Sequence, residues 1–293
     1  MKVLITGASG QVGRALLQSV PSGIEARALT RAQLDISDEA AVRDEVLTSQ
    51  PALIINAAAY TAVDKAQSEP ELAAAINAAG PRHLAQAAQA IAGCRLLHIS
   101  TDYVFDGRAS EPYRPADRTN PLSVYGRTKL AGERAALGVL RERAVVLRTA
   151  WVYAAAGKNF LLTMLRLMRE RGAVRVVADQ YGAPTAASSI AHALWVIAQR
   201  PDVHGTLHWT DAGTASWYEF AQAIAKDASA MGLLPQAAQV TPIASAQYPT
   251  AAPRPAYSVL ATGSSTAQLG LTPMPWRVNL RTTLNTLVRP APT

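Results

Sequence analysis

The chain has 293 residues, of which 49% are hydrophobic and 17% charged. This length suits one large domain or two unequal ones, and the composition excludes a mainly disordered protein. No stretch approaches the roughly 18 consecutive apolar residues of a membrane-spanning helix, and the start of the chain lacks the longer apolar segment of a signal peptide. Because Cys94 is the single cysteine, we expect no internal disulfide and a cytoplasmic location.

The formal net charge is +7, with 28 basic and 21 acidic side chains. The basic residues are scattered, no run of five or six like charges occurs, and no nucleic-acid-binding motif accompanies them. We therefore expect no nucleic-acid partner and no membrane partner. A mildly basic surface suits an anionic small-molecule substrate through long-range attraction.

Short apolar segments alternate with helical segments through the first half of the chain. The predicted strands cover residues 2–6, 24–29, 52–56, 95–100 and 144–148, and the predicted helices cover 13–20, 39–49, 71–92 and 128–140. This alternation is typical of βαβ units, in which helices cover both faces of a parallel sheet. The sequence predicts a Rossmann-type, doubly wound α/β domain over residues 1–150.

The alternation becomes irregular after residue 150. Helices are predicted at 160–171, 188–199 and 217–231, with irregular Pro- and Ala-rich stretches at 242–255 and 273–275. We expect residues 151–293 to form mainly a smaller, interleaved substrate-binding domain, from which residues of about 175–210 return to the first domain.

A glycine-rich turn, Gly7-Ala8-Ser9-Gly10-Gln11-Val12-Gly13, directly follows the first predicted strand and opens a helix. In this context glycines permit a tight turn and close approach to a pyrophosphate, which binds at the helix N-terminus. We predict a dinucleotide site, with cofactor contacts from Gly7, Gly10, Gln11, Val12 and Gly13. The alternative is a tight turn without a ligand.

The residues that follow the second and third strands indicate which dinucleotide binds. Thr30-Arg31 follows the second strand where an acidic residue would favour NAD, and an arginine there accommodates a 2′-phosphate. We expect NADPH, with NADH as a second cofactor, although Arg31 also fits a solvated surface residue. Further cofactor contacts are predicted for Asp35, Ile36, Ala57, Ala58 and Ala59.

Tyr125 and Lys129 are four residues apart, which places both on one face of a helix. A tyrosine with its ordinary pKa near 10 is a poor acid–base group, and a neighbouring ammonium is expected to lower that pKa. Thr101 directly follows the fourth predicted strand and is expected to hold a substrate carbonyl, with Ser100 as the competing candidate. These three residues, Thr101, Tyr125 and Lys129, form the predicted catalytic group.

The chain resembles the dTDP-4-dehydrorhamnose reductase family of extended short-chain dehydrogenase/reductases over residues 1 to about 280. The matching segments are 7–13, 56–65, 100–107, 120–133, 148–160, 179–185 and 254–260. Ser-Thr-Asp-Tyr-Val-Phe, at 100–105, is the most specific of them.

The resemblance implies NADPH-dependent reduction of the C4 ketone of dTDP-4-dehydro-β-L-rhamnose, the last step in making dTDP-L-rhamnose for surface polysaccharide. It implies that Tyr125 donates the proton, that Lys129 adjusts Tyr125 and holds the cofactor ribose, and that Thr101 orients the ketone. The loop with Tyr60 would line the cofactor cleft. Substrate contacts are expected from Thr61, Val63, Thr101, Asp102, Tyr103, Trp151 and Arg254. For Arg254, a role in holding a loop is the alternative.

Some members of the family bind Mg²⁺ through carboxylates at a dimer interface. The matching positions here hold Ala15 and the segment 190–192, none of which is acidic, and no Asp or Glu follows Arg254. Mg²⁺ requires oxygen ligands, so we expect no such metal site. We accordingly expect a monomer or a weak homodimer.

Two alternative functions stay open. One is another extended short-chain nucleotide-sugar reductase or epimerase. A 4,6-dehydratase is disfavoured, because Tyr103 follows Asp102 where such an enzyme has a glutamate. The other is a non-catalytic NADP-binding regulatory subunit, since a regulatory subunit of methionine adenosyltransferase resembles this family.

Overall fold

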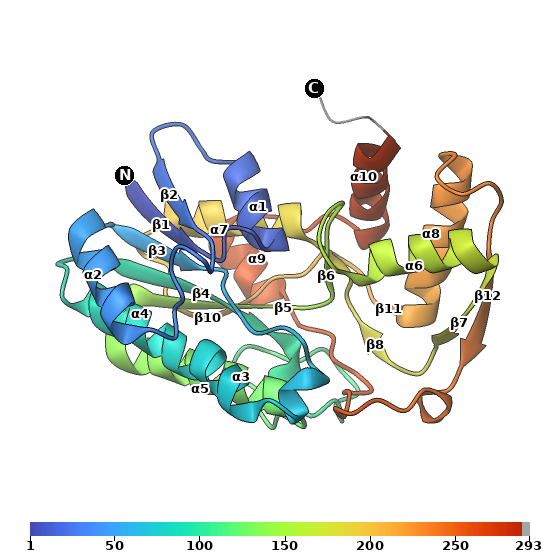
Figure 1. The fold of residues 1–293 in the computed structure, drawn as a ribbon, viewed down its shortest axis with the longest axis horizontal. Helices are drawn as coiled ribbons and strands as arrows, with labels where there is room; N and C mark the ends of the chain where they lie inside the picture. Colours follow the sequence, from blue (N-terminus) through green and yellow to red (C-terminus); the bar gives the residue numbers. More distant parts are fainter. Residues whose placement is uncertain (289–293) are drawn as a thin grey trace.

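The computed structural model describes residues 1–288 and has a six-stranded parallel sheet at the centre of its larger lobe (Figure 1). The order across the sheet is β10-β5-β4-β3-β1-β2. The strands are β1 (Lys2–Thr6), β2 (Glu25–Leu29), β3 (Leu53–Asn56), β4 (Arg95–Thr101), β5 (Ala144–Thr149) and β10 (Gly205–His208). All neighbouring pairs are parallel. The prediction of a Rossmann-type α/β fold is confirmed.

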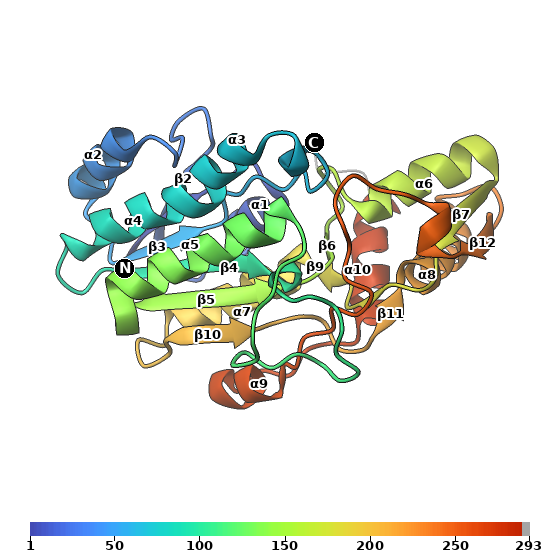
Figure 2. The same ribbon diagram turned by 90° about the horizontal axis from the view of Figure 1, so that it is seen from below.

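Helices cover both faces of this sheet (Figures 1 and 2). The helices α2 (Glu39–Ser49), α4 (Gly80–Gln89) and α5 (Val124–Leu140) pack on one face, and α1 (Gln11–Gln18), α7 (Ala187–Ala198) and α9 (Gly263–Leu269) pack on the other. Successive side chains of β1 point to opposite faces of the sheet. Leu4 packs in the hydrophobic core on the side of α2, α4 and α5, whereas Val3 and Ile5 pack in the core on the side of α1, α7 and α9. Burial on both faces explains why these strands are continuous apolar runs.

A smaller lobe has a separate hydrophobic core, in which Leu161, Phe220 and Leu280 are completely buried. Its main elements are α6 (Phe160–Arg171), α8 (Trp217–Ala230), α10 (Trp276–Val288), and the parallel pair β7 (Ala173–Val177) and β12 (Gln239–Ile243). Shorter paired strands are β6 (Val152–Tyr153) with β9 (Thr185–Ala186), and β8 (Tyr181–Gly182) with β11 (Ala215–Ser216). The chain enters this lobe after β5, returns to the large sheet with α7 and β10, and then enters it again (Figure 1).

Several element boundaries differ from the sequence predictions. The helix predicted over 71–92 consists of α3 (Pro70–Ala74), a π-helical turn (Ala75–Ala79) and α4. Pro81 has no N–H for the carbonyl of Asn77 four residues earlier, which favours the wider turn. The helix predicted over 128–140 begins at Val124, so that Tyr125 lies in its first turn. Neither α10 nor β12, which includes Pro242, was predicted.

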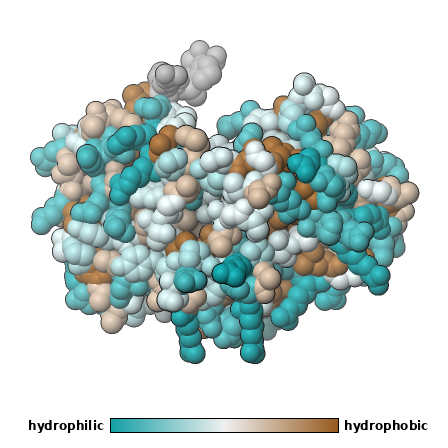
Figure 3. All heavy atoms as spheres, turned by 180° about the vertical axis from the view of Figure 1, so that it is seen from behind, coloured by the Kyte–Doolittle hydropathy of each residue, from teal (hydrophilic) through white to brown (hydrophobic). Residues whose placement is uncertain are grey.

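The face of the molecule in Figure 3 is mostly hydrophilic, with hydrophobic residues in small separate groups. Within residues 1–288, no helix combines the length and apolar character required to cross a membrane.

Candidate functional site

The predicted site residues follow the carboxyl ends of adjacent strands. Gly7 follows β1, Ala57 follows β3, Thr101 ends β4, and Trp151 lies two residues beyond β5. After β1 the chain adds β2 on one side of β1. It then crosses to the other side of β1 to form β3, and β4, β5 and β10 continue outward in that direction, so the strand order reverses between β1 and β3. Open parallel sheets bind ligands in the crevice at such a reversal.

A cavity of about 310 Å³ lies at this reversal. It brings together nine predicted cofactor residues, which are Gly7, Gly10, Arg31, Asp35, Ile36, Ala57, Ala58, Ala59 and Tyr60. Thr61, which was predicted to contact the substrate, lines the same cavity. The residues that sequence reasoning missed are Ser9, Leu34, Ala62 and Ile76. The lining does not include Gln11, Val12, Gly13 or Thr30, nor does it include Tyr125 or Lys129, the lysine expected to hold the cofactor ribose.

The glycine turn has the geometry of a phosphate cradle. Gly7 has φ of +73°, and a Cβ atom there would lie 2.6 Å from the backbone carbon of Ala57. Gly10 precedes α1 as its N-cap residue, with no side chain over the first turn. The open turn and the helix N-terminus therefore fit an anionic group such as a pyrophosphate.

Arg31 lies at the rim of this cavity with a largely exposed side chain. Its Nε donates to Asp35 Oδ2 at 3.1 Å. Asp35 Oδ1 accepts from both the backbone N–H and the hydroxyl of Ser37, and these bonds to Ser37 hold the pKa of Asp35 below its usual value. Asp35 thus orients Arg31 beside the cavity, where a guanidinium can bind a phosphate.

Thr101 and Asp102 are both buried at the end of β4. The hydroxyl of Thr101 donates to Asp102 Oδ1 at 3.0 Å and accepts from the backbone N–H of Tyr103 at 3.2 Å. Within the described residues, Asp102 Oδ2 is buried and has no hydrogen-bond partner. Burial raises the pKa of Asp102 to about 6. This enclosed oxygen has acceptor capacity left, which a hydroxyl can use where ligand binding opens access to it.

Tyr125 lies in the first turn of α5, where Ser123 caps the helix by accepting from the N–H of Gly126. A Cβ on Gly126 would lie 2.2 Å from the carbonyl oxygen of Tyr103, so a glycine is needed for this close approach. The rings of Tyr103 and Tyr125 meet edge to face with centroids 5.8 Å apart. The segment that carries Thr101 and Asp102 is thereby packed against the tyrosine.

Burial raises the pKa of Tyr125 to about 12, although a hydrogen bond with the Thr101 side chain opposes the change. The expectation that the ammonium of Lys129 lowers this pKa is therefore wrong for the free protein. Removal from water disfavours the phenolate more than the neighbouring groups stabilise it. Tyr125 stays protonated at neutral pH, as a proton donor must.

Lys129 extends from α5 towards β4 and is almost completely buried. Its Nζ donates to the carbonyl oxygen of Ile99 at 2.6 Å and lies 3.4 Å from His98 Nε2. Burial lowers the pKa of Lys129 to about 8, while the charge of Glu133 acts in the opposite direction. Glu133 itself forms a buried, bidentate ion pair with Arg148 at 2.7 and 2.9 Å.

Asn77, in the π-helical turn, is a residue that the sequence analysis missed. Its Oδ1 accepts from the backbone N–H of Tyr60 at 2.8 Å, and its Nδ2 donates to the carbonyl of Tyr60 at 3.0 Å. The same Nδ2 reaches Thr128 on α5 at 3.3 Å. An asparagine inside a predicted helix, where its propensity is low, was the available signal. It fixes the loop at Tyr60 relative to α5.

Trp151 takes a left-handed backbone conformation, with φ of +45°, directly after β5. Its ring stacks on Trp217 with centroids 3.4 Å apart and an angle of 4° between the planes. A Cβ on Gly182 would lie 2.5 Å from this indole. Trp151 is therefore held by the smaller lobe, and Trp217 supports it by stacking.

Arg254 binds within the protein. Its guanidinium donates to Asp64 Oδ2 at 2.8 Å and to the carbonyl of Ala252 at 3.0 Å, and the N–H of Ala252 donates to Asp64 Oδ1. The predicted contact Val63, which is half-buried, directly precedes Asp64. These bonds give Arg254 a role in holding the loop after β3, and substrate contact by Arg254 stays a prediction.

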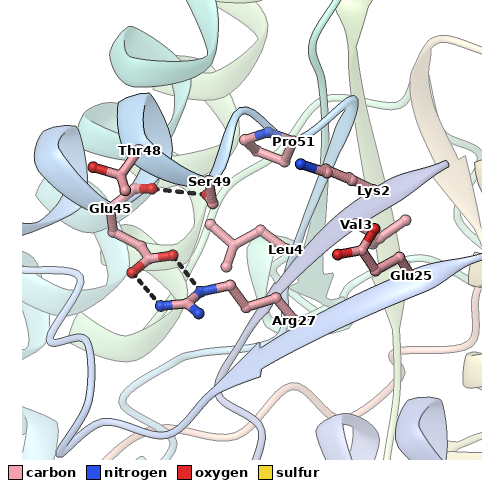
Figure 4. Close-up of a pocket in the computed structure, with 9 residues that line it drawn as sticks. All are labelled: Lys2, Val3, Leu4, Glu25, Arg27, Glu45, Thr48, Ser49 and Pro51. Carbon is pink, nitrogen blue, oxygen red and sulfur yellow. Dashed lines mark hydrogen bonds and ion pairs between the residues drawn. The ribbon is translucent and has the colours of Figure 1, made fainter.

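A second depression, of about 290 Å³, lies between the edge of the sheet and α2 (Figure 4). Lys2 and Glu25 begin β1 and β2 there, and Arg27 faces Glu45 from β2. It is at the amino ends of the strands and collects none of the predicted site residues. Among residues 1–288, no group of three or more His, Cys, Asp or Glu side chains is arranged to hold a metal ion.

Comparison with known proteins agrees with this geometry. Residues 1–289 match the model of the RmlD substrate binding domain. The chain belongs to the RmlD family. The resemblance to dTDP-4-dehydrorhamnose reductases is confirmed, because a protein of that name from Mycolicibacterium smegmatis is 46% identical, with 96% of this chain and 84% of the relative covered.

Two further proteins extend the comparison of this RmlD family member. A crystal structure of dTDP-4-dehydrorhamnose reductase from Bacillus anthracis, in complex with NADP, is 34% identical with a TM-score of 0.91, and 97% and 99% of the two chains are covered. A Streptomyces antibioticus protein named as a probable dTDP-4,6-dihydroxy-2-methyloxan-3-one 4-ketoreductase is 42% identical over 96% of this chain and 94% of its own. Family membership thus includes relatives named for different sugars.

Proposed function

We propose that this protein reduces the C4 ketone of dTDP-4-dehydro-β-L-rhamnose to dTDP-L-rhamnose with NADPH. The observation that carries the proposal is the group formed by the buried Thr101 and Lys129 and the half-buried Tyr125, at the edge of the sheet that holds the dinucleotide cavity. A protonated phenol, a hydroxyl and a lysine amine are the groups needed to hold and protonate a ketone oxygen.

The residues of the cavity fit NADPH. Gly7 and Gly10 leave space for a pyrophosphate at the N-terminus of α1, and the exposed guanidinium of Arg31 fits a 2′-phosphate. NADPH bound there supplies the hydride that reduces the ketone. NADH, which lacks the 2′-phosphate, is expected to act as a weaker alternative.

In the proposed mechanism, the hydroxyl of Thr101 turns its one hydrogen from Asp102 Oδ1 to the ketone oxygen, and Tyr125 transfers its proton to the same oxygen as negative charge develops. The high pKa of Tyr125 keeps this proton in place until charge appears on the substrate. Lys129, whose pKa of about 8 lies near working pH, returns a proton to the phenolate. Donors that are fixed before reaction stabilise the developing charge without reorganisation.

The sugar is proposed to lie between the two lobes. Asp102 Oδ2 accepts a sugar hydroxyl, Tyr103 packs beside it, and Trp151, held by Trp217, forms an apolar wall. The loop with Thr61 and Val63 adjoins the cavity. In this arrangement residues 1–150 bind the cofactor, together with α7 and β10, which return to the large sheet, and the smaller lobe mainly binds the substrate. Within the predicted returning segment of about 175–210, β7, β8 and β9 belong to the smaller lobe instead.

The decisive experiment compares wild type with Tyr125→Phe. NADPH oxidation with enzymatically prepared dTDP-4-dehydrorhamnose is expected to fall by about 10²- to 10⁴-fold, as for loss of a general acid. NADPH binding, followed by fluorescence titration, is expected to stay the same. A folded wild type that binds NADPH but does not oxidise it with this substrate would refute the reductase proposal and favour a regulatory role.

A second candidate substrate comes from the Streptomyces antibioticus relative, which is named for another dTDP-linked ketone. The two candidates share the nucleotide and a C4 ketone and differ in the sugar. The ratio of kcat/KM for the two ketones distinguishes them. We further propose that the enzyme works in the cytoplasm, where NADPH and nucleotide sugars are found, as a monomer or a weak homodimer without nucleic-acid or membrane partners.

A further inference from the structure

A chain of buried polar side chains runs under the sheet's carboxyl edge and ends at Lys129. Thr6 lies on β1, Asn56 on β3 and His98 on β4, and each of the three is completely buried. None of them lines the dinucleotide cavity. Buried polar groups are costly unless their hydrogen bonds are satisfied, so such a chain across three strands requires an explanation.

The orientation of Asn56 is fixed by two donors. The hydroxyl of Thr6 donates to Asn56 Oδ1 at 2.7 Å, and the backbone N–H of Ala58 donates to the same oxygen at 3.1 Å. If the amide were reversed, the N–H of Ala58 would face an NH₂ group. Asn56 Nδ2 therefore points at His98 Nδ1, at 3.0 Å.

This orientation determines the tautomer of His98. Because Asn56 Nδ2 is a donor only, His98 Nδ1 must accept, and the ring proton of a neutral imidazole is then on Nε2. Burial and the charge of Lys129 both lower the pKa of His98 well below its usual value, so the ring stays neutral. The Nε2–H is directed at Lys129 Nζ, 3.4 Å away.

We propose that His98 is a positioning residue that presents an N–H to the amine of Lys129 and thereby favours the uncharged form of this lysine. An ammonium has no lone pair to accept that N–H, whereas a neutral amine does. The effect of His98 on Lys129 does not depend on the proposed function, but its consequence for catalysis does. If Lys129 restores the proton of Tyr125, His98 sets the pH range in which it can do so.

The other charged groups around Lys129 do not reverse this effect. Glu133, which lies on α5 with Lys129, favours the ammonium form of the lysine. Both oxygens of this carboxylate, however, accept hydrogen bonds from Arg148 on β5. Tyr125, one turn earlier, is neutral, and the carboxylate of Asp102, just beyond β4, accepts a hydrogen bond from the Thr101 hydroxyl. Two groups from β4 meet Nζ directly: the carbonyl oxygen of Ile99 at 2.6 Å, which can accept from a charged or an uncharged lysine, and the ring of His98 at 3.4 Å.

The tautomer can be measured without any substrate. Long-range ¹H–¹⁵N correlation spectra of histidine-labelled protein distinguish an Nε2–H from an Nδ1–H ring, and the chain has five histidines, with His98 assigned from the spectrum of His98→Gln. We expect His98 as the neutral Nε2–H tautomer throughout the neutral range. A proton on Nδ1, or a charged ring, would overturn the proposal.

The effect on Lys129 is measured by titrating the Cε–Hε signals of ¹³C-lysine-labelled protein. The chain has only five lysines, and Lys129→Met identifies the buried one among Lys2, Lys65, Lys129, Lys158 and Lys226. In Asn56→Asp the carboxylate accepts Nδ1–H, the tautomer reverses, and Nε2 accepts from the ammonium. We expect the Lys129 midpoint to rise by about one pH unit or more, a tenfold gain in proton affinity.

The variant His98→Gln controls for the added charge of Asn56→Asp, because its amide can turn an oxygen towards Nζ without introducing a carboxylate. A rise of the Lys129 midpoint in both variants supports the proposal, and a rise in Asn56→Asp alone assigns the effect to charge and refutes it. His98→Gln also keeps the test available if Asn56→Asp does not fold. These titrations hold even if the reductase proposal fails, so the two failures are distinguishable.

Discussion

Asp64 and Arg254 are 190 positions apart in the chain and form an ion pair at 2.8 Å. The pair joins the loop after β3 to the segment that follows β12. Because the same loop contains Tyr60 and Thr61, which line the dinucleotide cavity, the ion pair connects the cofactor side of the site with the C-terminal third of the chain.

Breaking this pair is expected to weaken substrate binding more than cofactor binding. Asp64 is half-exposed, so the coupling energy from a cycle of Asp64→Asn, Arg254→Gln and the double variant should be only about 0.2–1 kcal/mol. Against the effect of burial, the N–H of Ala252 and then the guanidinium of Arg254 lower the pKa of Asp64. The stability that these contacts contribute is present above the ordinary carboxyl pKa and is lost as the pH falls through the lowered value. We expect KM for the nucleotide sugar to rise in each single variant, and an unchanged KM would exclude a role in the site.

Arg31→Ala is expected to remove the preference for NADPH. Loss of a charge-assisted contact to the 2′-phosphate costs about 1.5–3 kcal/mol, so KM for NADPH should rise about tenfold or more while KM for NADH stays the same. Arg27→Ala is the matched control, because Arg27 is also an exposed arginine but pairs with Glu45 away from the cavity. Equal effects of the two variants on NADPH would show that Arg31 is an ordinary surface residue.

The raised pKa of Asp102 leads us to expect that substrate binding weakens at acidic pH. Its pKa of about 6 means that the carboxylate, which accepts the sugar hydroxyl, is lost as the pH falls through 6. KM for the nucleotide sugar should therefore rise below this pH in wild type, and Asp102→Asn should have a high KM without this dependence. Initial rates on both sides of pH 6 measure it. A wild-type KM that does not change across this range would contradict the assignment.

The same carboxyl affects folding in the opposite sense to an ordinary ion-paired aspartate. Its pKa is higher in the folded protein, so the folded state binds more protons between the ordinary carboxyl pKa and about 6, and stability falls as the pH rises through this window. Asp102→Asn should remove that part of the pH dependence in denaturant unfolding.

Glu133→Gln is expected to destabilise the fold strongly. It leaves the buried guanidinium of Arg148 without its bidentate partner, which costs about 3–5 kcal/mol. Glu170→Gln breaks an exposed pair with Arg166 and should cost no more than about 1 kcal/mol. Urea unfolding of the two variants gives the comparison. Similar losses in both would mean that water reaches the Glu133–Arg148 pair.

Much of the fold and of the site could be predicted from the sequence because it depends on local patterns. The runs at Lys2–Thr6 and Leu53–Asn56 are apolar throughout, as strands buried on both faces must be. The turn that begins at Gly7 and the spacing of Tyr125 and Lys129 indicated a dinucleotide site and a helix-borne pair. Each of these signals lies within a few residues of sequence.

The failed predictions involve contacts between distant segments. The π-helical turn within the helix predicted over 71–92 goes with Pro81, which cannot donate to the carbonyl of Asn77, and it carries the Asn77 side chain that binds the loop at Tyr60. Trp217 could not be assigned to the site from the sequence, because it begins α8 and its stacking partner Trp151 lies in the distant segment after β5. The short strand β12 was not predicted, because Pro242 is unfavourable inside a strand. It forms by pairing with β7, more than 60 residues earlier in the chain.

The sequence by itself determined which chemical groups are present and on which strand or helix they are carried, since apolar periodicity and glycine spacing act locally. Only the tertiary structure decided their states. Burial raises the pKa of Tyr125 and lowers that of Lys129, and the bonds from Thr6 and Ala58 to Asn56 select the tautomer of His98. Solvation and hydrogen-bond direction depend on neighbours that three strands and the helix α5 bring together, and no local pattern encodes them.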